Sequence, residues 1–141
     1  ITGSENKVEE AKSYGAHNVV VASDIDAIKK LKKSFDYLFF TGHAFKGKWG
    51  LFMNTLKPKG RLHFLGLLPE PLNITMFHML RGQNSVSASP VGGPEAMKKM
   101  VEFCARHKII PEVEFFKMSE INEAIAHLKS GKARYRIVLE N

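Results

Sequence analysis

Three glycine-bearing segments follow apolar runs and are the first candidates for chemistry. They are Thr41-Gly42-His43, Gly66-Leu67-Leu68 and Ser89-Pro90-Val91-Gly92-Gly93. Because ligands of open parallel sheets bind beyond the carboxyl ends of the strands, such strand exits are where a ligand would be held. Glycine allows close approach of a ligand to the backbone, but turns after strands also need glycine for their own geometry. Spacing alone leaves a ligand site and plain turns as equal alternatives.

Side chains that could hold a metal ion are scattered along the chain. The single cysteine, Cys104, excludes an intrachain disulfide and a site of several cysteines. The histidines show no His-x-x-x-His spacing, so each is expected to be a surface or packing residue. His43, at a strand exit, is the one position worth watching. We predict neither a metal site nor a catalytic residue in this chain. The histidines are His17, His43, His63, His78, His107 and His127.

The elements that would position the strand exits alternate between strand and helix. This alternation predicts a doubly wound α/β sheet, and right-handed crossovers would place helices on both of its faces. Helices are expected at 5–14, 49–56, 74–80 and 94–107, after a cap at Ser23, and between Ser119 and Gly131. Strands are expected at 18–21, 35–41, 61–66, 85–89, 113–116 and 134–139.

Four local details follow from individual residues. Ser4 is placed to cap the first helix, and Gly15 to end it in a left-handed conformation. The segment 35–41 is apolar on both alternating sets, which predicts a strand in the middle of a sheet. Residues 57–60, Lys-Pro-Lys-Gly, should form the turn that closes the helix at 49–56.

Composition bounds the function only loosely. The 141 residues, 44% of them hydrophobic and 25% charged, make about one domain, and the formal charge of +7 favours acidic partners without choosing among them. No aromatic residues interleave with the lysine runs, so nucleic acid is an unlikely partner. The absence of a membrane-length apolar run and of a signal segment favours a cytoplasmic protein with no membrane partner. Because residue 1 is isoleucine, we expect the chain to be part of a longer one.

Segments spread over nearly the whole chain resemble one known family. On these segments the sequence resembles the zinc-dependent medium-chain alcohol dehydrogenases, and within them the cinnamyl alcohol dehydrogenase branch, which prefers NADP. The segments are Ser4-Glu5-Asn6-Lys7, Tyr14-Gly15-Ala16, Phe35-Asp36-Tyr37, Lys59-Gly60-Arg61-Leu62, Leu65-Gly66, Pro69-Glu70-Pro71-Leu72, Phe103-Cys104-Ala105-Arg106-His107 and Tyr135-Arg136.

The resemblance implies an incomplete coenzyme-binding portion. Residues 1–110 would form a partial NADP-binding Rossmann-like domain, a parallel sheet with helices on both faces that lacks its first strand and its glycine-rich turn. Residues 111–141 would return to pack on the catalytic domain. That domain and the zinc ligands would lie upstream of this chain. The sheet would then have two bare edges, which another copy or a rearranged strand would have to cover.

The resemblance also implies which residues contact the coenzyme. Thr2, Ser4 and Lys7 would hold the ribose 2′-phosphate of NADP, since no acidic residue stands at the position that binds the ribose diol of NAD. The alternative is a plain helix cap at Ser4 and a solvated Lys7. Pro90 departs from the small residue usual at its exit and removes a backbone donor. The remaining expected contacts are Thr41, Leu65, Gly66, Leu67, Ser87, Ala88, Ser89 and, at the pyrophosphate, Arg136.

The implied activity belongs to the parent enzyme. It would transfer hydride between a small alcohol or aldehyde and NADP with the help of zinc, and this portion would be inactive alone. Two alternatives remain: a non-catalytic remnant that dimerises or binds nucleotide, and a basic nucleic-acid module. The family also implies a homodimer through the strand Ser85–Ser89, where two sheets would join edge to edge.

Overall fold

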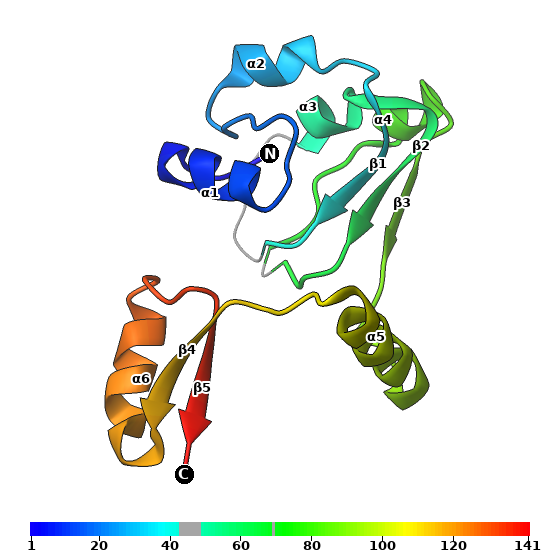
Figure 1. The fold of residues 1–141 in the computed structure, drawn as a ribbon. Coiled ribbons are helices and arrows are strands. Elements are labelled where there is room, and N and C mark those ends of the chain that lie inside the picture. Colours follow the sequence, from blue (N-terminus) through cyan, green and yellow to red (C-terminus); the bar gives the residue numbers. More distant parts are fainter. Residues whose placement is uncertain (43–48, 69) are drawn as a thin grey trace. The chain divides into compact units, whose positions relative to one another are not determined.

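The computed structural model describes residues 1–42, 49–68 and 70–141 (Figure 1). The chain forms two compact units, Ile1–Val91 and Gly92–Asn141, and each is described by itself. The first unit ends at Val91, earlier in the chain than the functional boundary expected at residue 110. That boundary concerns what residues 111–141 pack on in a longer protein, and it stays a prediction.

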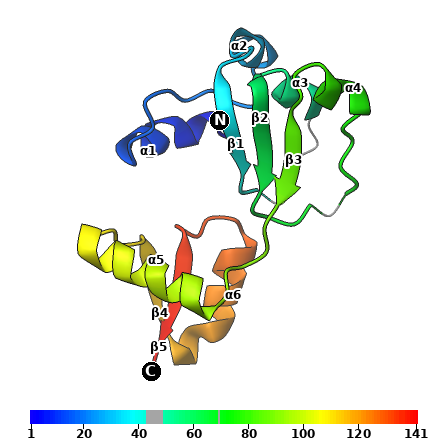
Figure 2. The ribbon, with the colours of Figure 1, turned by 90° about the vertical axis from the view of Figure 1, so that its right-hand side faces the viewer.

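A parallel three-stranded sheet organises the first unit. Its strands are β1 (Phe35–Phe40), β2 (Leu56–Phe64) and β3 (Ser85–Ala88), in the order β1-β2-β3. Helix α3 (Trp49–Met53) precedes β2, and α4 (Met76–Leu80) precedes β3. Figure 2 shows the three strands side by side. The parallel α/β architecture expected from the alternation is confirmed.

The core lies on one face of this sheet. Trp49 of α3 contacts Phe40 and Phe64, with ring centroids 5.1 and 5.2 Å apart. On the opposite face, Tyr37 and Phe39 are 60% and 64% exposed. The prediction of a middle strand buried on both faces is therefore wrong for β1 in the described sheet, because β1 ends the strand order and these two side chains are exposed. The buried cluster is Trp49, Met53, Leu56, Leu62 and Phe64.

The segment expected as a turn at 57–60 lies inside β2. Helix α3 ends at Met53, and β2 pairs first Leu56 with Phe35 and then Arg61 with Tyr37. The residues between these pairs form an irregularity in the ladder. A bulge tolerates a proline such as Pro58, which has no N–H to donate. The expected helix 49–56 is accordingly shorter, because Asn54 and Thr55 form a turn and Leu56 begins β2.

The N-terminal segment contains η1 (Glu5–Lys7), α1 (Val8–Ser13) and α2 (Ile25–Lys30). The Ser4 side chain does not cap a helix but donates to Asn6 Oδ1 at 2.6 Å, which corrects the expected cap. The cap of α2 is Asp24, which accepts from Ala27 N at 2.9 Å, and not Ser23. Gly15, with φ +93°, follows α1 as expected. The strand at 18–21 reduces to one parallel bridge between Val21 and Thr2.

The second unit contains α5 (Pro94–His107), β4 (Val113–Lys117), η2 (Met118–Glu120), α6 (Ile121–Lys129) and β5 (Arg136–Glu140). Strands β4 and β5 are parallel neighbours. Ser119 lies inside η2 and not at a cap, because Glu120 Oε2 receives the Lys117 N–H instead. No helix within the described ranges has the length and apolar character needed to cross a membrane.

Candidate functional site

The three strands of the first unit end level with one another at their carboxyl ends. Leu65 N donates to Phe40 O at 2.9 Å, and Ser89 N donates to Phe64 O at 3.1 Å. The ladder thus continues one residue past β2 and β3, and Leu65, Ser89 and Thr41, which follows Phe40, lie at the carboxyl ends of the three strands. The structure therefore brings these three predicted site residues together.

Gly66 is the contact point between two exits. A Cβ built on Gly66 would lie 2.7 Å from Gly42 O and 3.5 Å from Thr41 O. Any side chain at residue 66 would thus push against the backbone that leaves β1. The packing of two exits is sufficient to require glycine here. Its presence is therefore compatible with a ligand site but does not by itself indicate one.

The exit of β2 presents apolar side chains to solvent. Leu65 is 53% exposed and Leu67 is 90% exposed. Thr41, which directly follows β1, is also exposed. Apolar side chains beside a few polar groups are one feature of ligand-binding surfaces. The exits supply this apolar surface together with the hydroxyls of Thr41 and Ser89.

Ser87 lies on the sheet face rather than beyond the exit. Its hydroxyl is 2.8 Å from His63 Nδ1, and the two residues are register partners in β3 and β2. The His63 ring in turn packs edge-on against Phe39, with centroids 5.9 Å apart. Sequence reasoning missed this open-face cluster, although the alternation in Phe-Asp-Tyr-Leu-Phe-Phe already placed Tyr37 and Phe39 on the same side of the strand.

Thr2, Ser4 and Lys7, the residues expected to hold the 2′-phosphate, lie close together at the start of the chain and are linked by hydrogen bonds. Thr2 bonds to both sides of Val21, through Thr2 N to Val20 O at 2.9 Å and through Ala22 N to Thr2 O at 2.8 Å. Thr2 Oγ1 donates to Ser4 O at 3.4 Å, and Lys7 N to the same oxygen at 3.3 Å. Lys7 is exposed and has no carboxylate within 4 Å among the described residues.

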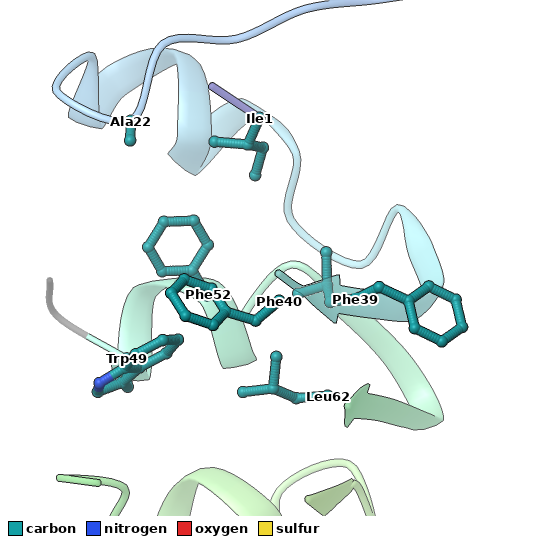
Figure 3. Close-up of a pocket in the computed structure, with 8 residues that line it drawn as sticks. Ile1, Ala22, Phe39, Phe40, Trp49, Phe52 and Leu62 are labelled. Carbon is teal, nitrogen blue, oxygen red and sulfur yellow. The ribbon is translucent and has the colours of Figure 1, made fainter. Parts of the chain in front are cut away.

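An apolar hollow of about 170 Å³ separates this segment from β1 (Figure 3). Ile1 and Ala22 line one side, and residues of the β1, α3 and β2 region line the other. None of the described residues that line it has a charged side chain, so this lining suits apolar groups and not phosphates. It adjoins the edge of β1 that has no strand neighbour in the described sheet. Its remaining lining residues are Leu38, Phe39, Phe40, Trp49, Phe52 and Leu62.

The described residues do not fit a zinc site. They contain no group of three or more His, Cys, Asp or Glu side chains close enough to hold a metal ion. Cys104 is a free thiol on α5. His43, the histidine singled out in the sequence, lies outside the described residues.

Arg136 belongs to the second unit, where it is exposed and opens β5 as the register partner of Val113. The loop before it is tied down by Glu114, which accepts from Arg134 N and lies 2.6 Å from His127 Nε2. The start of β5 is thereby held in place by side chains of β4 and α6. Contact of Arg136 with a pyrophosphate stays a prediction.

Comparison with known proteins gives a consistent picture. A family model described as zinc-binding dehydrogenase matches residues 1–106. The aldehyde reductase AdhA of Synechocystis is 46% identical over 99% of this chain, and cinnamyl alcohol dehydrogenase 3 of Arabidopsis thaliana is 36% identical over 97%. The chain spans 41% and 36% of the lengths of these two relatives.

Solved structures agree with these sequence matches. A cinnamyl alcohol dehydrogenase from Sorghum bicolor superposes with a TM-score of 0.89 at 26% identity, over 97% of this chain and 39% of that one. The Helicobacter pylori cinnamyl alcohol dehydrogenase complexed with NADP(H) gives a TM-score of 0.76 at 26% identity, over 98% and 39%.

The contact at Gly66 predicts the effect of a single methyl group. Gly66→Ala should destabilise the first unit by about 1–3 kcal/mol, because the added Cβ meets backbone and not a movable side chain. Gly3→Ala is the matched control, since a Cβ there has nothing within 4 Å. Urea unfolding followed by the fluorescence of Trp49, the one tryptophan, measures both. Equal stability of the two variants would contradict the close approach.

Proposed function

The chain belongs to the zinc-binding dehydrogenase family, and from this we propose that it is the C-terminal coenzyme-binding portion of an NADP-dependent alcohol dehydrogenase. The observation that carries the proposal is the 46% identity to an aldehyde reductase along 99% of the chain. The reaction of the whole enzyme is hydride transfer between a small alcohol or aldehyde and the nicotinamide ring. Because the chain spans about two fifths of that relative, the portion by itself is proposed to be inactive.

The coenzyme proposal rests on the strand exits and on the first turn of the chain. The adenosine and nicotinamide halves would lie over Thr41, Leu65, Gly66 and Leu67, and the end of β3 with Ser87 and Ser89 would face the nicotinamide. Thr2, Ser4 and Lys7 would hold the 2′-phosphate, for which a cation without a carboxylate partner is suited. Arg136 would reach the pyrophosphate. A relative in complex with NADP(H), 26% identical, supports this choice of coenzyme.

The hollow beside β1 supports the view that the portion is incomplete. It is apolar, and it lies between the Thr2–Val21 bridge and a strand edge that has no neighbour in the described sheet. An extended apolar segment of a longer polypeptide would pair with β1 there and fill the hollow. Zinc in the parent enzyme would be held by residues outside those described here. No step of the reaction is assigned to side chains of this chain.

A non-catalytic remnant is the alternative, and turnover separates the two. Protein produced from the complete reading frame of the gene should oxidise NADPH when given an aldehyde, whereas the 141-residue chain should show no turnover and weak or undetectable binding of NADPH and NADH by calorimetry. Spectrophotometry of NADPH loss measures turnover. A complete reading frame that begins at Ile1, or that encodes an unrelated domain upstream, would overturn the proposal.

Lys7 should set the preference for NADPH over NADH. In protein from the complete reading frame, Lys7→Gln should lower the affinity for NADPH about tenfold and leave that for NADH unchanged, because only NADPH carries the 2′-phosphate. Lys12→Gln on the neighbouring helix is the control, since Lys12 is paired with Glu9 at 2.7 Å. Calorimetric titration gives both affinities, and an unchanged ratio for Lys7→Gln would show that this lysine is merely solvated.

We also propose a homodimer through Ser85–Ser89. Strand β3 ends the strand order, so its outer edge is available for pairing within the described sheet. Ser89 N points to β2, and because successive N–H groups of a strand alternate in direction, Ala88 N–H faces the outer edge.

Ala88→Pro should therefore raise the dimer dissociation constant at least about tenfold, because it removes an outward donor and leaves the bonds to β2 intact. Ala88→Ser, which keeps the N–H, should leave the dimer unchanged. Sedimentation equilibrium measures the constant. A dimer that is insensitive to the proline must use another surface.

A further inference from the structure

Three adjoining hollows open at the amino ends of the strands, away from the exits. The exposed side chain of Asn54 lines all three, whose volumes are about 170, 520 and 90 Å³. Helices α2, α3 and α4 gather at this end of the sheet, as Figures 1 and 2 both show. The three hollows are therefore neighbours, and we call them together the Asn54 surface.

Among the described residues, cations and no carboxylate line the Asn54 surface. Lys29, Lys32, Lys33 and Arg81 contribute to its lining. Lys29 is paired with Asp26 at 2.9 Å, and the hydrogen bond and charge of Lys29 lower the pKa of Asp26. Within the described ranges, the other three cations have no carboxylate oxygen within 4 Å. Three positive charges thus face the surface without a negative partner.

The helix dipole accounts for these cations only in part, although Lys32 and Lys33 follow α2 and Arg81 caps α4. Lysine and arginine often sit near helix C-termini because free carbonyls there carry partial negative charge. Here carbonyls in the last turns of α2, α3 and α4 already accept backbone N–H groups. The bonds are Leu31 N to Ile28 O at 3.0 Å, Thr55 N to Phe52 O at 3.0 Å and Asn84 N to Met79 O at 3.0 Å.

The backbone that carries the cations is anchored. Lys33 N donates to Asn54 O at 3.1 Å and Ser34 N to Thr55 O at 2.8 Å, which ties the segment after α2 to the end of α3. Arg81 stacks over the Phe77 ring at 5.6 Å from the centroid. Asn84 Nδ2 donates to Lys57 O at 2.7 Å and fixes the start of β3. The backbone that carries the cations is therefore fixed, and the guanidinium of Arg81 is held over the Phe77 ring.

We propose that the Asn54 surface binds an anion that carries two or more phosphate groups, at a site separate from the coenzyme site at the strand exits. Three unpaired cations match the charge of such an anion. The side chains of Asn54, Asn73 and Thr75 add neutral polar groups in the hollow that shares Asn54 with the two hollows lined by the cations. A free oligophosphate and the phosphate tail of a nucleotide share this chemistry. The inference does not depend on the proposed oxidoreductase function.

Calorimetric titration of the protein with sodium tripolyphosphate, at an ionic strength of about 0.15 M, tests the proposal. The double variant Lys32→Gln/Arg81→Gln should lower the affinity at least about tenfold. The matched control is Lys98→Gln/Arg106→Gln on α5, which removes the same two residue types and should leave the affinity nearly unchanged. Parallel titration with ATP separates the sources: tighter binding of ATP than of tripolyphosphate indicates a nucleotide, and the reverse indicates a free oligophosphate.

A second measurement guards against misfolded variants. In the unmodified protein, tripolyphosphate should shift the side-chain amide NMR signal of Asn54 and leave that of Asn122 on α6 in place. Equal losses in the two double variants, no saturable binding, or an unmoved Asn54 signal would each overturn the proposal. Binding of single-stranded DNA with a steep salt dependence, without binding of tripolyphosphate, would overturn it in favour of nucleic acid.

Discussion

The parallel pairing of β1, β2 and β3 is the constraint on which the rest of the first unit depends. Its register places Phe40, Phe64 and Ala88 level with one another, so the three chains leave the sheet at one edge. The same register brings together, at the amino ends of the strands, the segments that lead into them. One ladder therefore creates two separate surfaces, one at each end, with different chemistry.

The two ends differ because of which side chains the turns carry. The exits combine hydroxyls, a tightly packed glycine and exposed leucines, which suits a ligand with flat rings and polar groups. The entry turns carry lysine and arginine around Asn54, which suits concentrated negative charge. Trp49 lines both the Asn54 surface and the apolar hollow beside β1.

That hollow connects the fold to the proposed role. The N-terminal segment is paired only through the isolated bridge between Thr2 and Val21, among the described residues. An apolar gap lies between this bridge and β1. Phe40 and Trp49 line this gap as well, and both pack in the core, where they contact each other and Phe64. The unit is thus complete around β2 and open at β1, which agrees with a chain that spans about two fifths of its relatives.

Local signals in the sequence determined the alternation of strands and helices, the glycine after α1 and the family. The proximity of Thr2, Ser4 and Lys7 also follows from the sequence, because residues so close in the chain cannot lie far apart. Only the tertiary structure decided which neighbours each strand has. It exposed Tyr37 and Phe39, drew Pro58 into a bulge and engaged Ser87 with His63. It also brought Lys32 and Arg81, 49 positions apart in the chain, to one hollow. Burial and pairing depend on partners distant in sequence, which a local pattern of residue types does not specify.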